Sequence, residues 1–158
     1  MSQELVNAVL IGLDEDTVLL PNIAVAEVLS VERLEKHGDG TSGLAGHVQW
    51  NGRKVPVVSF EILNGAPFKS GVSSRGRVTL LHSIGSHALG VVGLLTQGYP
   101  HLVTLSREAV QPGEFRETDR PDLVLARVRI SSREALIPDF DAIEYDILRL
   151  QDPAAQIH

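Results

Sequence analysis

The chain has 158 residues, of which 43% are apolar, and its formal net charge is −6. This length fits one domain, or two small subdomains that share a core. The acidic balance argues against nucleic acid or an anionic membrane as the main partner. The lack of cysteine excludes disulfides, thiolate catalysis and cysteine-based metal sites. No apolar run approaches the roughly 18 residues that span a bilayer, so we expect a cytoplasmic protein without direct membrane insertion.

The first part of the chain predicts strands joined by polar turns. We expect strands over residues 5–13, 17–20 and 23–31, the last of them bent near Glu27. Residues 33–42 are polar and glycine-rich, which indicates a connection rather than a regular element. A single helical turn is the expectation for residues 43–45.

The dipeptide Asn51-Gly52 predicts a β-hairpin. Asn-Gly suits a type I′ turn because both central residues need positive φ, and apolar runs lie on both sides of it. The Trp50 ring would then cover the stem of Arg53 and its cation. The cross-strand pairs expected from a two-residue turn are Trp50 with Arg53, Val48 with Val55, and Gly46 with Val57.

The second half predicts further strands and one helix. Residues 61–63 suit a single helical turn, and residues 64–76 are the best candidate for a subdomain junction. The acidic stretch 114–122 is expected to be solvated surface. A capping box at Asp141 and Glu144 would open the C-terminal helix. The expected strands are residues 77–84, 87–95, 99–105, 123–130 and 134–137.

An ordered set of short motifs runs along nearly the whole chain. It consists of Leu20-Pro21 ahead of Val25-Ala26-Glu27-Val28, Gly46 before a strand, Asn51-Gly52 before Val55-Pro56-Val57, residues 78–112, and a last apolar strand leading into the helix. Over residues 4–150 this set resembles the CheW-like domain family, the adaptor modules of bacterial chemosensory arrays. Trp50 and Ser59-Phe60-Glu61 resemble the divergent ChpC-type members found in type IV pilus systems.

The resemblance implies a mainly β fold in which two five-stranded SH3-like barrels share a core, with a C-terminal helix. We expect one CheW-like domain over residues 4–150. The core of the first barrel is placed at about residues 17–63 and the second barrel at about residues 76–138. The strand 5–13 and the helix 139–150 would pack across both barrels, and residues 151–158 would form a tail.

The resemblance also implies a non-enzymatic adaptor with no catalytic residues, no cofactor and no metal. Such proteins couple the cytoplasmic helical tip of a methyl-accepting chemoreceptor to the regulatory domain of a CheA-type histidine kinase, at membrane-associated receptor arrays. The partner-binding residues transferred by position are Val25, Glu27 and Gly46 in a groove between the barrels, with Asn51 and Gly52 nearby. The family usually has Arg at the position of Asn51, where it interacts with the acidic residue equivalent to Glu27.

Other functions find weaker support in the sequence. Residues 38–43 match G-x-G-x-x-G, but they follow a polar stretch and precede a strand, unlike a dinucleotide fingerprint. The six histidines lack the spacing of metal ligands. Ser83, Ser86 and His87 lack a nucleophile elbow and a third catalytic member. The alternative function is a β-barrel module that binds a small molecule or peptide in a concave pocket.

Overall fold

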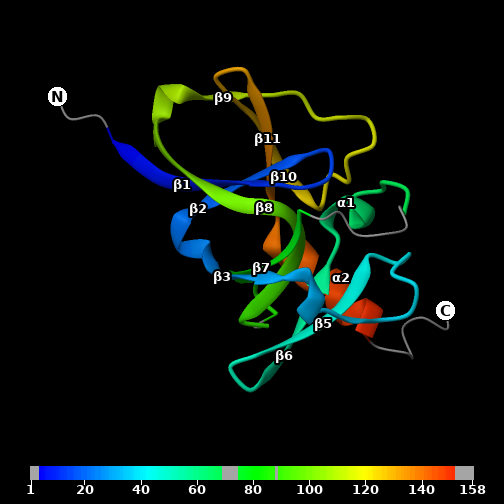
Figure 1. The fold of residues 1–158 in the computed structure, drawn as a ribbon. Helices are drawn as coiled ribbons and strands as arrows, with labels where there is room; N and C mark the ends of the chain where they lie inside the picture. The colour runs from blue at the N-terminus through cyan, green and yellow to red at the C-terminus, as the bar shows by residue number, and fades with distance from the viewer. Residues whose placement is uncertain (1–3, 69–74, 88, 152–158) are drawn as a thin grey trace.

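The computed structural model describes residues 4–68, 75–87 and 89–151, and within them the fold is mainly β (Figure 1). Residues 152–158 of the expected tail and part of the expected junction 64–76 lie outside the described residues, while Gln151 ends α2 instead of starting a tail. The strands are β1 (Leu5–Gly12), β2 (Thr17–Pro21), β3 (Val25–Ser30), β4 (Glu35–Lys36), β5 (Leu44–Trp50), β6 (Arg53–Val58), β7 (Gly76–His82), β8 (Val91–Ser106), β9 (Val110–Pro112), β10 (Val124–Ile130) and β11 (Arg133–Pro138). The helices are α1 (Phe60–Leu63) and α2 (Phe140–Gln151), with 3-10 turns η1 (Asn22–Ala24), η2 (Val31–Arg33) and η3 (Arg107–Ala109).

The long strand β8 connects two groups of strands. Its first half pairs with β7 and, in parallel, with β6, whereas its second half pairs with β1. Gly98 has a φ of +66° and lies between the two halves, where a side chain would be strained. Residues 91–95 and 99–105 of two expected strands are therefore parts of one continuous strand. The described residues of 87–90 precede it, and Ala88 lies outside the described residues.

The strand pairing corrects the expected division into barrels. β7 was expected in the second barrel, but it pairs with β3 and β8 and so belongs with β3–β6. β2 was expected in the first barrel, but it pairs with β1 and β11. The reason is that β8 is long enough to serve both groups: its first half keeps β7 beside β3, and its second half pairs with β1.

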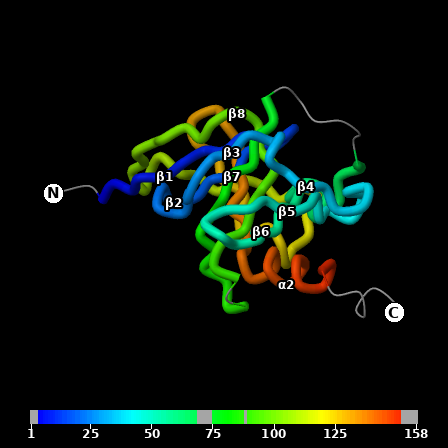
Figure 2. The backbone as a smooth tube through the Cα atoms, turned by 60° about the horizontal axis from the view of Figure 1, so that its bottom comes forward, coloured from blue at the N-terminus to red at the C-terminus, as the bar shows by residue number. Residues whose placement is uncertain are grey.

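Three apolar clusters fill the interior. One lies within the group β3–β7 around Val48, Val57 and Leu80, and a second lies within the other group around Leu10 and Leu105. The largest cluster lies between the groups and includes the buried face of α2, which runs beside β6 (Figure 2). The core is thus shared, as expected for two barrels that fold together. The buried residues of α2 in this cluster are Phe140, Ile143, Ile147 and Leu150.

Several local predictions are confirmed. Asn51 and Gly52 both have positive φ, at 49° and 72°, and the hairpin β5–β6 has the expected register. β3 has a register shift between Val25 and Glu27, which is the bend expected there. The prediction of a helical turn at residues 43–45 is wrong, because Leu44 is fully buried and pairs with Val58 as part of β5.

The start of α2 differs from the expected capping box. The carboxylate of Asp139 accepts the N–H of Asp141 at 2.9 Å, so Asp139 caps the helix. Asp141 and Glu144 instead accept hydrogen bonds from the connection between β7 and β8. Tertiary donors have replaced the local ones because Glu144 is fully buried against that connection.

Candidate partner-binding site

The end of the β5–β6 hairpin is tied to β3 by one polar contact. Nε1 of Trp50 donates a hydrogen bond to Oε2 of Glu27 at 2.5 Å. Trp50 is half-buried against the apolar cluster of its strand group, while Glu27 is exposed. The bulge after Val25 turns the Glu27 side chain outward, toward the indole. An uncharged donor therefore meets Glu27.

The Arg53 cation lies elsewhere than expected. Nη2 of Arg53 donates to the carbonyl oxygen of Leu89 at 3.3 Å, next to the start of β8. The cation–ring contact found within the described residues joins Arg77 to Tyr99, at 5.2 Å from the ring centroid. Trp50 and Arg53 thus fix the hairpin to two different neighbours, β3 and the β7–β8 connection.

The five residues predicted to bind partners fall into two sets. Asn51 and Gly52 are exposed at the hairpin turn, next to the contact between Trp50 and Glu27. Gly46 is buried, and a Cβ atom there would collide with the carbonyl oxygen of Glu35 in β4.

Val25, the remaining member of the five, is half-buried and packs against the central apolar cluster. The structure therefore leaves Glu27 and the hairpin turn open to a partner. Gly46 is a packing requirement of β4 rather than a contact surface.

A hollow of about 410 Å³ lies away from the hairpin turn. It is formed by η2 and β4 with the residues that follow them, α1, the β1–β2 turn, and the adjoining parts of β7 and β8. None of the five predicted residues lines it. Its lining comes from at least four separate stretches of sequence, so no local motif could have revealed it. The half-buried apolar side chains of its floor are Val31, Leu34, Ala45, Ile62 and Leu95.

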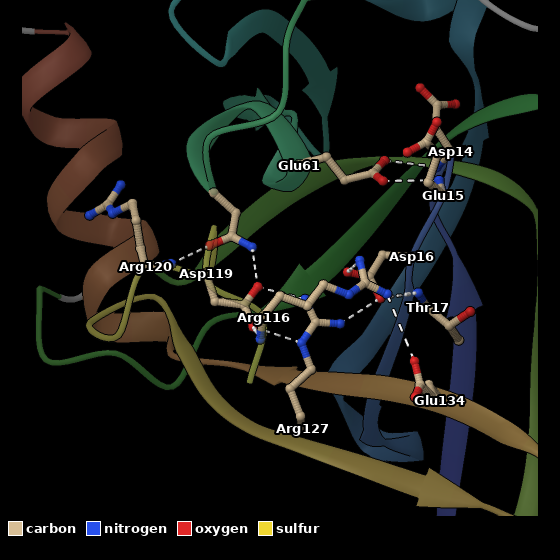
Figure 3. A network of polar contacts seen from close by, with 11 residues as sticks. Asp14, Glu15, Asp16, Thr17, Glu61, Arg116, Asp119, Arg120, Arg127 and Glu134 are labelled. Atoms are coloured by element: carbon tan, nitrogen blue, oxygen red, sulfur yellow. Dashed lines mark hydrogen bonds and ion pairs between the residues drawn. The ribbon is translucent and has the colours of Figure 1, made fainter. Parts of the chain in front are cut away.

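Glu61 fixes the β1–β2 turn at the rim of this hollow (Figure 3). Its two carboxylate oxygens accept the backbone N–H groups of Asp14, at 2.8 Å, and Glu15, at 2.9 Å. Partial burial outweighs these donors and raises the pKa of Glu61 above its usual value. Ser59 caps α1 by accepting the N–H of Ile62, so the Ser59-Phe60-Glu61 segment has a clear structural role.

The stretch 114–122, expected to be solvated surface, contains part of a buried ionic network (Figure 3). Arg127 binds Asp119 through two hydrogen bonds of 2.9 and 2.6 Å, and binds Asp16 through a third of 2.9 Å. The side chains of Arg127 and Asp119 are only 4% and 2% exposed. The expectation is therefore wrong for Asp119, because its charge is satisfied by a partner from β10 rather than by water.

The network continues from Asp119 to both helices. Asn64 donates to Asp119 at 3.0 Å and accepts the N–H of Arg120 at 2.8 Å. Arg120 in turn binds Asp146 of α2 at 2.6 Å. The Arg127 hydrogen bonds are the main cause that holds the pKa of Asp119 well below its usual range. This network joins the loop before β10 to the turn before β2 and to α2.

His87 of the β7–β8 connection and two carboxylates at the start of α2 form the closest approach to a metal-ligand set among the described residues. Ligand atoms of His87, Asp141 and Glu144 lie within 4.8 Å of one another. The carboxylates are already engaged, since Glu144 accepts from Ser83 and from the N–H groups of His87 and Leu89. Ser83, Ser86 and His87 therefore attach the β7–β8 connection to α2.

The sequence matches the profile of the CheW-like domain over residues 7–146. The chain belongs to the CheW-like domain family. Its structure is similar to the crystal structure of the scaffolding protein TtCheW from Thermoanaerobacter tengcongensis, with a TM-score of 0.67 and 18% sequence identity. That similarity covers 86% of this chain and 90% of the other. A search of curated proteins finds no match to the chain.

Membership confirms the expected fold class, a mainly β structure of two SH3-like barrels with a C-terminal helix. The CheW-like family is non-enzymatic, and the similar structure is described as that of a scaffolding protein. Among the described residues, no helix is long and apolar enough to cross a membrane.

Proposed function

We propose that this CheW-like protein is an adaptor that couples a chemoreceptor's cytoplasmic helical tip to the regulatory domain of a CheA-type histidine kinase. The match to the family over residues 7–146 is the observation that carries the proposal. The adaptor acts by geometry: it fixes the kinase relative to the receptor, and the signal passes as a shift in the kinase's population of states. Its place of work is the cytoplasmic face of a receptor array.

The receptor contact is proposed at the hairpin turn and Glu27. Asn51, Gly52 and Glu27 are exposed and lie together, because Trp50 binds Glu27 beside the turn. A charged residue on such a surface steers a partner and sets its orientation. Val25, which packs against the central apolar cluster, and Gly46, which β4 covers, have structural roles instead.

Calorimetric titration with the regulatory domain of a CheA-type kinase from the same cell tests the kinase half of the proposal. We expect saturable binding in the micromolar range. No binding by well-folded protein would contradict kinase coupling and leave a CheW-like fold with another partner.

Co-sedimentation with receptor-containing membranes tests the receptor half, and the matched variants are Glu27→Gln and Glu117→Gln. Both remove one exposed carboxylate, but only Glu27 lies on the proposed surface. We expect Glu27→Gln to reduce receptor association several-fold while kinase-domain binding is unchanged. Equal association of the two variants would show that the receptor binds elsewhere.

A narrower proposal assigns the protein to a type IV pilus chemosensory system. It is supported by the resemblance of Trp50 and Ser59-Phe60-Glu61 to ChpC-type proteins. Deletion of the gene would then reduce twitching and leave flagellar swimming intact. The opposite pattern would place the adaptor in a flagellar pathway.

The alternative function, a module that binds a small molecule or peptide, gains support from the 410 Å³ hollow, whose size falls in the usual range of ligand sites. A thermal-shift screen of metabolites tests it. Strong stabilisation by one compound would favour this function over a purely scaffolding role.

A further inference from the structure

We propose that the 410 Å³ hollow binds an extended peptide segment of a partner protein, one that carries large apolar side chains next to Lys or Arg. This goes beyond the adaptor role, since the hollow is lined by none of the residues assigned to the receptor contact. Three features of its lining carry the proposal: an apolar floor, an excess of carboxylates and a free strand edge.

The floor supplies apolar surface that is only half covered. Leu34 and Ile62 are half-buried there, and Phe68, which also lines the hollow, has 43% of its surface exposed. Removing such apolar surface from water is favourable. The hollow is therefore suited to one or two large aliphatic or aromatic side chains.

The net negative charge of the side chains around the floor favours a peptide with a basic residue. Four carboxylates line the hollow against two basic side chains. The guanidinium of Arg77 is turned to the Tyr99 ring and to the carbonyl oxygen of Gly76, which leaves Lys36 as the basic group with its charge at the rim. The carboxylates belong to Asp14, Glu15, Asp39 and Glu61.

Glu61 is the carboxylate whose ionised form a peptide cation would stabilise most. Its pKa is raised because burial outweighs its two backbone donors, so a nearby positive charge would stabilise its ionised form.

The edge of β4 favours a peptide over a small molecule. Within the described residues β4 pairs with β5 alone and ends the sheet path. The N–H of His37 donates to the carbonyl oxygen of Ala45, so in this antiparallel ladder the intervening Lys36 points its own N–H and C=O away from β5. Lys36 also lines the hollow. An added strand uses free main-chain groups of this kind and places alternate side chains in the adjoining pocket.

Selection from a randomised hexapeptide phage library on the purified full chain tests the proposal. The Ala66→Trp variant serves for counter-selection: Ala66 is exposed and lines the hollow, so the indole fills the site without entering the core. We expect enrichment of peptides that pair Leu, Ile or Phe with Lys or Arg. Enrichment of acidic peptides, or of none, would overturn the proposal.

Chemical-shift mapping with an enriched peptide then locates the site. We expect shifts at Lys36 and Ile62, at least tenfold weaker binding to Ala66→Trp, and weaker binding at high salt. Asp39→Asn should bind two- to threefold more weakly, because it removes a charge while keeping an oxygen for Thr41. Glu117→Gln, which removes a carboxylate elsewhere, should bind normally. Binding of octylammonium alone at these residues, without peptide binding, would identify a small-molecule site and refute the peptide.

Discussion

Replacing Arg127 by Met should destabilise the protein far more than the loss of an ordinary ion pair. Arg127 is 4% exposed and satisfies the buried carboxylates of Asp119 and Asp16, at 2% and 7% exposure. Met keeps much of the volume, but it leaves the buried Asp119 without its cation and leaves Asp16 only the half-exposed Arg116, at 3.5 Å. Removing one partner of a buried pair costs about 3–5 kcal/mol. For a chain of this size, that corresponds to a fall in melting temperature of roughly 6–20 °C.

Urea denaturation followed by the fluorescence of Trp50, the single tryptophan, and by circular dichroism measures this loss. Arg107→Met is the matched control, because its pair with Glu4 is 87% exposed on both sides and should contribute about 0.5 kcal/mol or less. Adding Asp119→Asn to Arg127→Met should recover part of the stability by removing one orphaned charge. A loss below about 1 kcal/mol for Arg127→Met would refute the idea that this network holds the loop in place.

Three further predictions follow from the same structure. Gly46→Ala should lower the free energy of unfolding by about 2 kcal/mol or more, because its Cβ meets the backbone of β4. Gly52→Ala has open space around it and should lower that free energy by about 1 kcal/mol, from its positive φ alone. The urea midpoints of the two variants compare these effects. Glu144→Gln should speed hydrogen exchange of the β7–β8 connection, because it replaces one of the two oxygens that accept from the N–H groups of His87 and Leu89 with an NH₂ donor. The lowered pKa of Asp119 gives stability that is present above its unfolded pKa of about 3.9 and is lost as pH falls through the folded value. Unfolding free energies measured from pH 5 to pH 2 should therefore fall less steeply for Asp119→Asn than for the unchanged protein.

Features decided by neighbours in sequence were predictable. The type I′ hairpin at Asn51-Gly52 depends on two φ values and on the alternating strands beside it, and both its turn and its register are confirmed. The bend in β3 near Glu27 and the final helix are of the same kind. In each case the signal and the structure lie within a few residues of one another.

Features decided by distant partners were not predictable. Arg127 and Asp16 are 111 positions apart, and nothing near Asp119 marks it as buried rather than solvated. Asp141 and Glu144 have the spacing of a capping box, but donors about 55 residues away hold them instead. The hollow likewise needs side chains from both strand groups. The sequence next to a carboxylate looks the same whether water or a buried cation satisfies its charge.

The neutral donor on Glu27 bears on the receptor contact proposed for this protein. The resemblance implies an Arg at the position of Asn51 that pairs with the equivalent acid and cancels its charge. Here the indole of Trp50 satisfies the geometry of Glu27 with a hydrogen bond but leaves the negative charge in place. The surface beside the hairpin turn therefore keeps a negative charge. Under the proposed function, this charge favours a receptor tip with a basic residue and makes the encounter sensitive to salt. Asn51→Arg should then lower that salt sensitivity, since the new cation lies beside Glu27 and offsets its charge.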